Sequence, residues 1–122
     1  MKLKDRRIAR RFGDGLAGLS QAWRRERSFR TQISASVVAL TIILSLQPPL
    51  AWQIGLAAML AVGFAAELFN ASIEALLDRL HPDEHVEIGA AKDMSSAAVL
   101  IINIASATIF AGGLLAALGG RG

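Results

Sequence analysis

Three long apolar stretches constrain the fold of this chain more than any other feature of its sequence. They cover residues 29–47, 50–80 and 89–118. A helix needs about 20 predominantly apolar residues to cross the hydrocarbon core of a bilayer. The first stretch reaches this length only if it includes Arg30, whose long side chain can extend toward the membrane surface. The sequence therefore predicts an all-α membrane protein with three transmembrane helices.

Prolines and polar residues mark the connections between these helices. Pro48 and Pro49 follow the first stretch, and proline cannot continue a helical hydrogen-bond ladder. The polar segment 81–88, HPDEHVEI, contains Pro82 and separates the second stretch from the third. We expect a short uncharged turn at one end of the bundle and a polar loop over 81–88 at the other end.

Residues 1–28 form a strongly basic arm before the first apolar stretch. Ten of the thirteen Lys and Arg residues lie in the first 30 positions. This arm is predicted to be an amphipathic helix in the plane of the lipid headgroups. Three glycines within 13–18 weaken such a helix, so its continuity is left open. The apolar residues recur at three- and four-residue steps: Ile8, Phe12, Leu16, Leu19 and Trp23.

The charge distribution also predicts an orientation. Cytoplasmic segments of membrane proteins carry an excess of Lys and Arg, so the arm and the 79–92 connection, which includes Arg79 and Lys92, should face the cytoplasm. Nucleic acid is the competing partner for a basic arm. However, 53% of the residues are apolar, which disfavours a nucleic-acid-binding module. The arm is too long for the basic region of a signal peptide, so we expect the chain to remain uncleaved.

Polar side chains form a stripe on the second predicted helix. Glu67, Asn70, Glu74 and Asp78 fall within about 80° of one another and span about 16 Å along a helix axis. The seventeen residues before Glu67 carry no charge. Ionisable groups within a membrane helix are costly and by default indicate a functional site.

Further polar residues are expected at the same depth as this stripe. Glu26 ends the arm, and Lys92, Asp93 and Ser96 begin the third apolar stretch. Clustered carboxylates without Cys or His favour a hard cation such as Mg²⁺, and a lysine beside them favours a phosphate. A carboxylate such as Glu67 can accept a proton from a hydroxyl. Together these groups indicate phosphoryl transfer.

The same polar residues are also compatible with roles outside phosphoryl transfer. The acids could pair with nearby arginines and Lys92 as interfacial anchors. Glu67 could carry protons in a small transporter, although a carrier would place its carboxylate near the middle of the membrane. Asn103 is expected to bridge two helices rather than to line a cavity. The arm contains GDGLAG, but no strand precedes it, so dinucleotide binding is disfavoured.

Two motifs resemble the prokaryotic diacylglycerol kinase family, which also includes undecaprenol kinases. The first is ELFNASIEALLDR over 67–79, and the second is GAAKDMSSAAVL over 89–100. The segment ERSFR over 26–30 is similar to a further segment of the family, and the resemblance covers roughly residues 10–118. Ala71 stands where the family has Ser or Thr. Gln32 stands where some relatives have glutamate, and Asp14 stands where an aromatic residue can pack on adenine.

The resemblance implies a bacterial inner-membrane enzyme with three transmembrane helices and an N-terminal surface helix. It implies a homotrimer whose active sites are shared between subunits. The implied reaction is Mg²⁺-dependent transfer of phosphate from ATP to a lipid hydroxyl at the cytoplasmic interface. Diacylglycerol is the first expectation for the substrate, with phosphatidic acid as the product, and undecaprenol is the alternative.

The resemblance also implies a role for each polar residue. Glu67 would be the general base, Asn70 would orient the reacting groups and Lys92 would neutralise the transferred phosphoryl group. Glu26 and Glu74 would hold the metal ions. The remaining expected contacts are with the nucleotide, at Asp78, Gly89, Lys92 and Asp93, and with the lipid, at Glu67, Ser96, Trp23 and Arg30.

Overall fold

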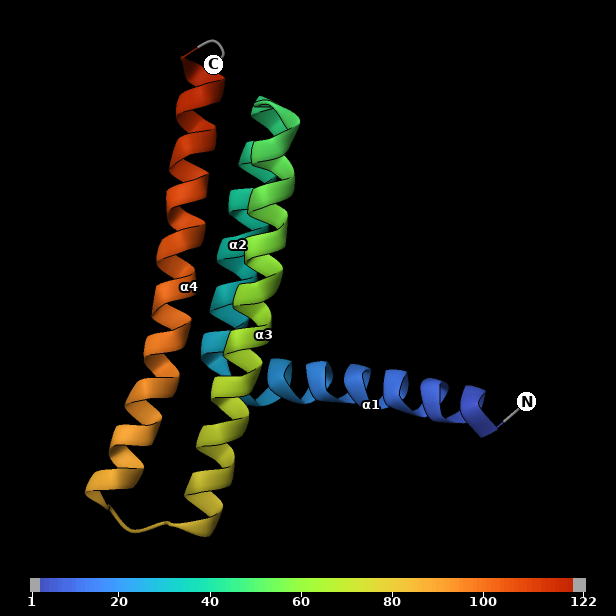
Figure 1. Ribbon diagram of the computed structural model, residues 1–122, viewed down its shortest axis with the longest axis vertical. Helices are drawn as coiled ribbons and strands as arrows, with labels where there is room; N and C mark the ends of the chain where they lie inside the picture. Colours follow the sequence, from blue (N-terminus) through green and yellow to red (C-terminus); the bar gives the residue numbers. More distant parts are fainter. Residues whose placement is uncertain (1–2, 120–122) are drawn as a thin grey trace.

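The computed structural model describes residues 3–119, and this part of the chain folds into four helices without any strand. The helices are α1 (Leu3–Arg25), α2 (Arg27–Leu46), α3 (Leu50–Leu80) and α4 (Val86–Leu118). Helices α2, α3 and α4 stand side by side, and α1 extends away from the bundle to one side, across the direction of the other helices (Figure 1). Helices α2, α3 and α4 are each long and apolar enough to cross a membrane. The predicted fold class is therefore confirmed. Residues 1–2 of the predicted arm and residues 120–122 lie outside the described part.

The connection between α2 and α3 follows from proline chemistry. Gln47 caps α2 in the left-handed conformation, with φ of 51°, and its backbone N–H donates to the Ile43 carbonyl at 3.0 Å. The two prolines that follow cannot continue the ladder, so the chain reverses and α3 starts at Leu50. This turn gives α2 and α3 antiparallel directions, as the sequence predicts.

Helix α4 begins three residues before the predicted start at 89, so the connection after α3 is shorter than the predicted loop over 81–88. The reason is local capping: His85 is extended, and its Nδ1 accepts a hydrogen bond from the Glu87 backbone N–H at 3.2 Å. This bond satisfies one of the free N–H groups at the start of a helix. Likewise, α2 begins at Arg27 rather than at 29, after an extended Glu26.

Helix α1 is continuous despite its glycines, which settles the question that its sequence left open. The apolar stripe is exposed along its length, from Ile8, 59% exposed, to Trp23, 46% exposed. At its end, Arg30 Nη1 donates to the Trp23 carbonyl at 2.6 Å and to the Arg24 carbonyl at 3.3 Å. These bonds satisfy carbonyls that a helix end leaves free. They also tie the direction of α1 to α2.

The lengths of the helices decide which parts the membrane can cover. The 20 residues of α2 span about 30 Å, which equals the thickness of the hydrocarbon core. The 31 residues of α3 and the 33 of α4 span about 46 and 50 Å. Their ends accordingly extend past the level of α1, and the connection between them lies beyond it (Figure 1). The last part of α3 therefore projects out of the membrane if α1 lies on its surface.

Small residues bring α3 and α4 close together at the end of the bundle opposite α1. Trp52 of α3 packs across Gly112 and Gly113 of α4, and Ile43 of α2 completes this contact. Close backbone approach at glycine is a common way to pack membrane helices. Inside the bundle, Phe29, Ile43 and Leu56 are each 1% exposed.

We expect Gly112→Ala to destabilise the protein by about 1–3 kcal/mol, because the new methyl group would overlap the rigid Trp52 ring. Thermal unfolding in detergent measures this effect. Gly55→Ala is the matched control, because its methyl group would meet only Ile109 Cγ2 at 3.9 Å. Equal unfolding temperatures for the two variants would show that the Trp52 ring does not pack against Gly112.

Candidate active site

Glu67 lies at the centre of the candidate site. This carboxylate is only 4% exposed and accepts a hydrogen bond from Ser28 Oγ at 2.7 Å, so α3 meets the start of α2 at this point. A buried carboxylate is costly unless polar groups surround it. Ser28 supplies one such group, and an arriving hydroxyl could supply another. The groove around Glu67 has a volume of about 660 Å³ and is lined by Arg27, Ser28, Thr31, Gln32, Ala35, Glu67 and Asn103.

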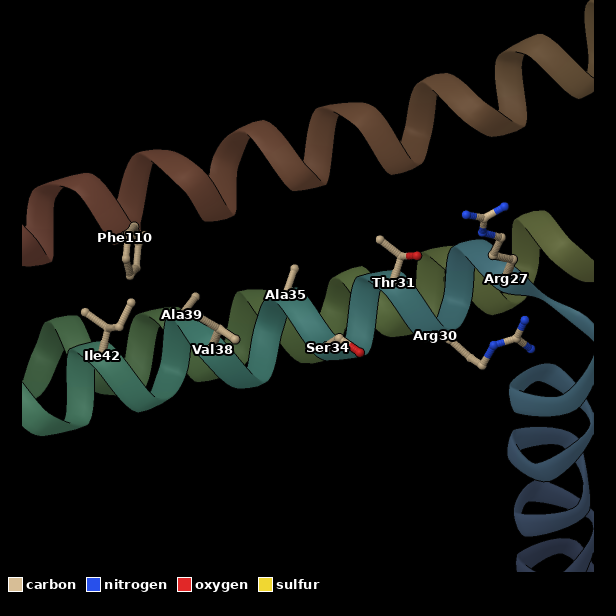
Figure 2. Close-up of a pocket in the computed structure, with 9 residues that line it drawn as sticks. All are labelled: Arg27, Arg30, Thr31, Ser34, Ala35, Val38, Ala39, Ile42 and Phe110. Carbon is tan, nitrogen blue, oxygen red and sulfur yellow. The ribbon is translucent and has the colours of Figure 1, made fainter.

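The groove around Glu67 continues along α2 into an apolar groove of about 810 Å³. The two share Arg27, Thr31 and Ala35. Figure 2 shows that Phe110 of α4 points toward α2 near Ile42, at the far end from the two arginines. The combined surface is polar and cationic at one end and apolar at the other. Its shape and chemistry suit a lipid whose headgroup lies beside Glu67.

Asp78 and Lys92 join α3 to α4 close to the connection between these helices. Lys92 Nζ donates to Asp78 Oδ1, and no other salt bridge occurs within residues 3–119. Both residues line a pocket of about 570 Å³ together with Gly89 and the connection after α3. The structure thus brings together three residues that the sequence assigned to a nucleotide. Asp93 is exposed and does not line this pocket.

Asn70 and Glu74 occupy the same face of α3, between Glu67 and Asp78. Both are half-buried. Asn70 Oδ1 is buried and has no hydrogen-bond partner in the described part of the chain. A buried polar atom without a partner costs free energy.

Glu26 and Glu67 line different grooves, although both were expected in one layer. Glu26 lines a groove of about 720 Å³ between α1 and α3, beside Leu68, Phe69 and Ser72. No residue lines both this groove and the groove around Glu67. The two carboxylates therefore open onto different grooves of one chain.

The carboxylates of one chain do not form a complete metal cage. Among residues 3–119, no three His, Cys, Asp or Glu side chains are close enough together to hold a metal ion. Magnesium usually keeps several waters and takes only one or two carboxylates together with phosphate oxygens. The separate carboxylates at Glu26 and Glu74 fit that mode of binding.

The residues expected to contact the lipid, apart from Glu67, lie in three different parts of the structure. Ser96 is exposed on α4, and Trp23 is 46% exposed at the end of α1. Arg30 lines the apolar groove on α2 while it caps α1. Of the three, only Arg30 lies in the groove that continues from Glu67.

Sequence reasoning missed two residues of the site. It gave Ser28 no role and noted Gln32 only as a departure from the family pattern, because nothing local predicts which residues of α2 will meet α3 and α4. The expectation that Asn103 bridges two helices is confirmed, because its side chain is hydrogen-bonded to Gln32. Asn103 also lines the groove around Glu67, which the sequence interpretation disfavoured.

Comparison with known proteins identifies the family. The family model for prokaryotic diacylglycerol kinase matches residues 13–114. A diacylglycerol kinase of Escherichia coli K12 is 36% identical over 95 residues, which are 78% of each chain. A diacylglycerol kinase of Pseudomonas aeruginosa is 32% identical over 111 residues, which are 88% of this chain and 90% of the relative. The chain therefore belongs to the prokaryotic diacylglycerol kinase family and is an enzyme of the lipid kinase class.

Proposed function

We propose that this protein transfers the γ-phosphate of ATP to the hydroxyl of diacylglycerol, which gives phosphatidic acid. The observation that carries this proposal is the buried Glu67 carboxylate at the polar end of an apolar groove. A lipid hydroxyl can reach such a carboxylate while the acyl chains follow α2. Family membership favours a kinase over the proton-coupled transporter that the sequence left open.

In the proposed reaction, Glu67 accepts the proton of the lipid hydroxyl. The hydroxyl oxygen forms a bond to the γ-phosphorus, the bond from this phosphorus to the bridging oxygen breaks, and ADP leaves. Glu67 acts as the general base, and the Ser28 hydroxyl orients it. Asn70 would orient the reacting groups, and Lys92 would stabilise the charge on the transferred phosphoryl group. Asp78, Gly89 and Asp93 would contact the nucleotide.

Glu26 and Glu74 would hold Mg²⁺ together with the phosphates of ATP. The ion would neutralise phosphate charge. Glu74 lies one turn from Asp78 on α3. It is therefore close to the pocket that Asp78, Gly89 and Lys92 line.

The protein is a bacterial membrane protein, and we place its arm and the connection after α3 on the cytoplasmic side. The excess of Lys and Arg in the arm supports this orientation. ATP is available on that side, and the ends of α3 and α4 project beyond the level of α1 there (Figure 1). In this arrangement the lipid groove opens within the membrane and the nucleotide pocket opens in water.

The active site would be shared between copies in a homotrimer. The separation of Glu26 from Glu67 supports this arrangement, because the two carboxylates line different grooves of one chain. Two groups that act in one reaction but lie on different sides of a subunit can meet across an interface.

Subunit mixing tests this sharing. Glu26→Gln and Glu67→Gln should each be inactive alone, but a 1:1 mixture allowed to exchange subunits should recover about a quarter of wild-type activity, since a quarter of the shared sites would then be intact. Labelled subunits would verify that exchange has occurred. A fully exchanged mixture without recovery would mean that both carboxylates serve the same site from one chain.

The substrate is tested by parallel assays in mixed micelles, with diacylglycerol and undecaprenol as acceptors and MgATP labelled in its γ-phosphate. We expect kcat/KM for diacylglycerol to be at least about tenfold higher, which corresponds to about 1.4 kcal/mol. A preference for undecaprenol would reassign the lipid while keeping the proposed chemistry.

A further inference from the structure

Two amide side chains bridge α2 and α4 inside the bundle. Gln32 Nε2 donates to Asn103 Oδ1 at 2.8 Å, and Asn103 Nδ2 donates to Gln32 Oε1 at 3.2 Å. Each amide is therefore both donor and acceptor to the other. An ionised carboxylate could not replace either amide in this exchange, because it has no hydrogen to donate. Neither residue has a role in the reaction proposed above.

The amide pair lies next to the contact that holds Glu67. On α2, Gln32 is one helical turn beyond Ser28, the residue that donates to Glu67. On α3, Gly63 is one turn from Glu67, on the side of the pair. A methyl group at Gly63 would lie 3.0 Å from Gln32 Nε2 and 3.7 Å from Asn103 Oδ1. The pair therefore occupies the space that Gly63 leaves free, and both amides line the Glu67 groove.

The physical properties of this pair favour positioning over stabilisation. Hydrogen bonds between membrane helices contribute little to stability on average, because the unfolded chain in a membrane also finds partners. They are nevertheless directional, and a reciprocal pair fixes both the separation and the rotation of the helices that carry it. A displacement of about 1 Å at a reacting group can reduce a rate about a hundredfold.

We propose that the Gln32–Asn103 pair is a positioning element for Glu67. It holds α2 and α4 at a fixed separation across Gly63, and this keeps Ser28 and the Glu67 carboxylate in the geometry that meets the lipid hydroxyl. The expected effect on turnover rests on the proposed kinase function. The expected effect on the exposure of Glu67 does not depend on that function.

Two double variants test the proposal in the full-length protein. Gln32→Leu with Asn103→Leu fills the space without hydrogen bonds, and Gln32→Asn with Asn103→Gln exchanges the two amides. We expect the leucine variant to lose at least about tenfold in kcat with diacylglycerol. Its KM for ATP and its thermal unfolding temperature should remain near wild type. The exchanged pair should recover most of the lost kcat. A folded leucine variant with wild-type kcat would overturn the proposal.

Carbodiimide labelling supplies a readout that does not need turnover. A hydrophobic carbodiimide should modify Glu67 at least about threefold faster in the leucine variant than in the wild type, because local opening exposes the carboxylate. The exchanged pair should restore slow labelling. Glu74 is the internal control within each molecule. Unchanged Glu67 labelling in the leucine variant would contradict the positioning role.

These readouts separate the positioning role from the kinase function. Faster labelling of Glu67 in a protein that phosphorylates neither lipid would retain the positioning role and reject the proposed function. If the leucine variant does not fold, Gly63→Ala takes its place, because its methyl group would lie 3.0 Å from Gln32 Nε2 and would shift that end of the side chain. Gly55→Ala is then the matched control, since its methyl group has no contact closer than 3.9 Å. Equal kcat and equal Glu67 labelling in these two alanine variants would overturn the proposal.

Discussion

Glu67→Gln should reduce kcat for lipid phosphorylation by about 10²–10⁴-fold while the protein remains folded, because general-base catalysis contributes a factor of this size. Glutamine has nearly the same shape as glutamate, and its Oε1 can still accept the Ser28 hydrogen bond. The substitution therefore removes the proton acceptor without opening a cavity. Steady-state kinetics with labelled ATP measures kcat, and thermal unfolding with size-exclusion chromatography in detergent verifies the fold.

Glu87→Gln is the control for this experiment. Glu87 lies in the first turn of α4, is exposed and lines none of the grooves described above. Its loss should leave kcat within about twofold of wild type, as for surface changes away from special features. A kcat near wild type in Glu67→Gln would exclude Glu67 as the base. It would mean that another group along the lipid groove accepts the proton.

The second large effect is expected at the ion pair of α3 and α4. Lys92→Met should reduce kcat by about 10²–10³-fold, since one group that stabilises developing charge contributes this much. A double variant, Asp78→Lys with Lys92→Asp, exchanges the two charges and keeps an ion pair between the helices. It would nevertheless leave α4 without its cation. We therefore expect the exchanged protein to be stable and inactive.

This exchange separates catalysis from anchoring, the alternative that the sequence left open. If the Asp78–Lys92 pair only anchored the helices, the exchanged protein would regain full activity and Lys92→Met would lose mainly stability. Lys4→Met, on the exposed arm, is the control for removal of a positive charge. It should change kcat by less than about twofold.

Much of the fold could be predicted because it depends on local chemistry. Pro48 and Pro49 end one helix and start the next, and three apolar stretches of sufficient length give three spans. The depth of the α3 stripe was harder to predict. Hydropathy measures the apolar content of a helix but does not locate the membrane surface along it. The structure shows that α3 extends past the level of α1, so the end of α3 would lie outside the bilayer if α1 lies on the membrane surface.

For the candidate site, the sequence predicted the positions of the residues along the helix axes but not the rotation of the helices. Helical spacing placed Glu67 and Asp78 on one face of α3, and the turn before α4 brought Lys92 to the depth of Asp78. Spacing along the chain also placed Glu26 in this layer but could not show that it faces a different groove. That outcome depends on how α1 leaves α2, which the capping bonds of Arg30 decide. Contacts between distant residues, such as Ser28 with Glu67, depend on helix rotation and have no local signal.

The most direct test of the proposed kinase function is phosphate transfer by the purified wild-type protein. Folded protein in mixed micelles receives diacylglycerol and ATP labelled in its γ-phosphate, with and without Mg²⁺, and the lipid products are separated. We expect label to appear in phosphatidic acid, and we expect this product to depend on Mg²⁺. Label that stays in ATP or appears only as inorganic phosphate, with protein shown to be folded and oligomeric, would contradict the proposed function.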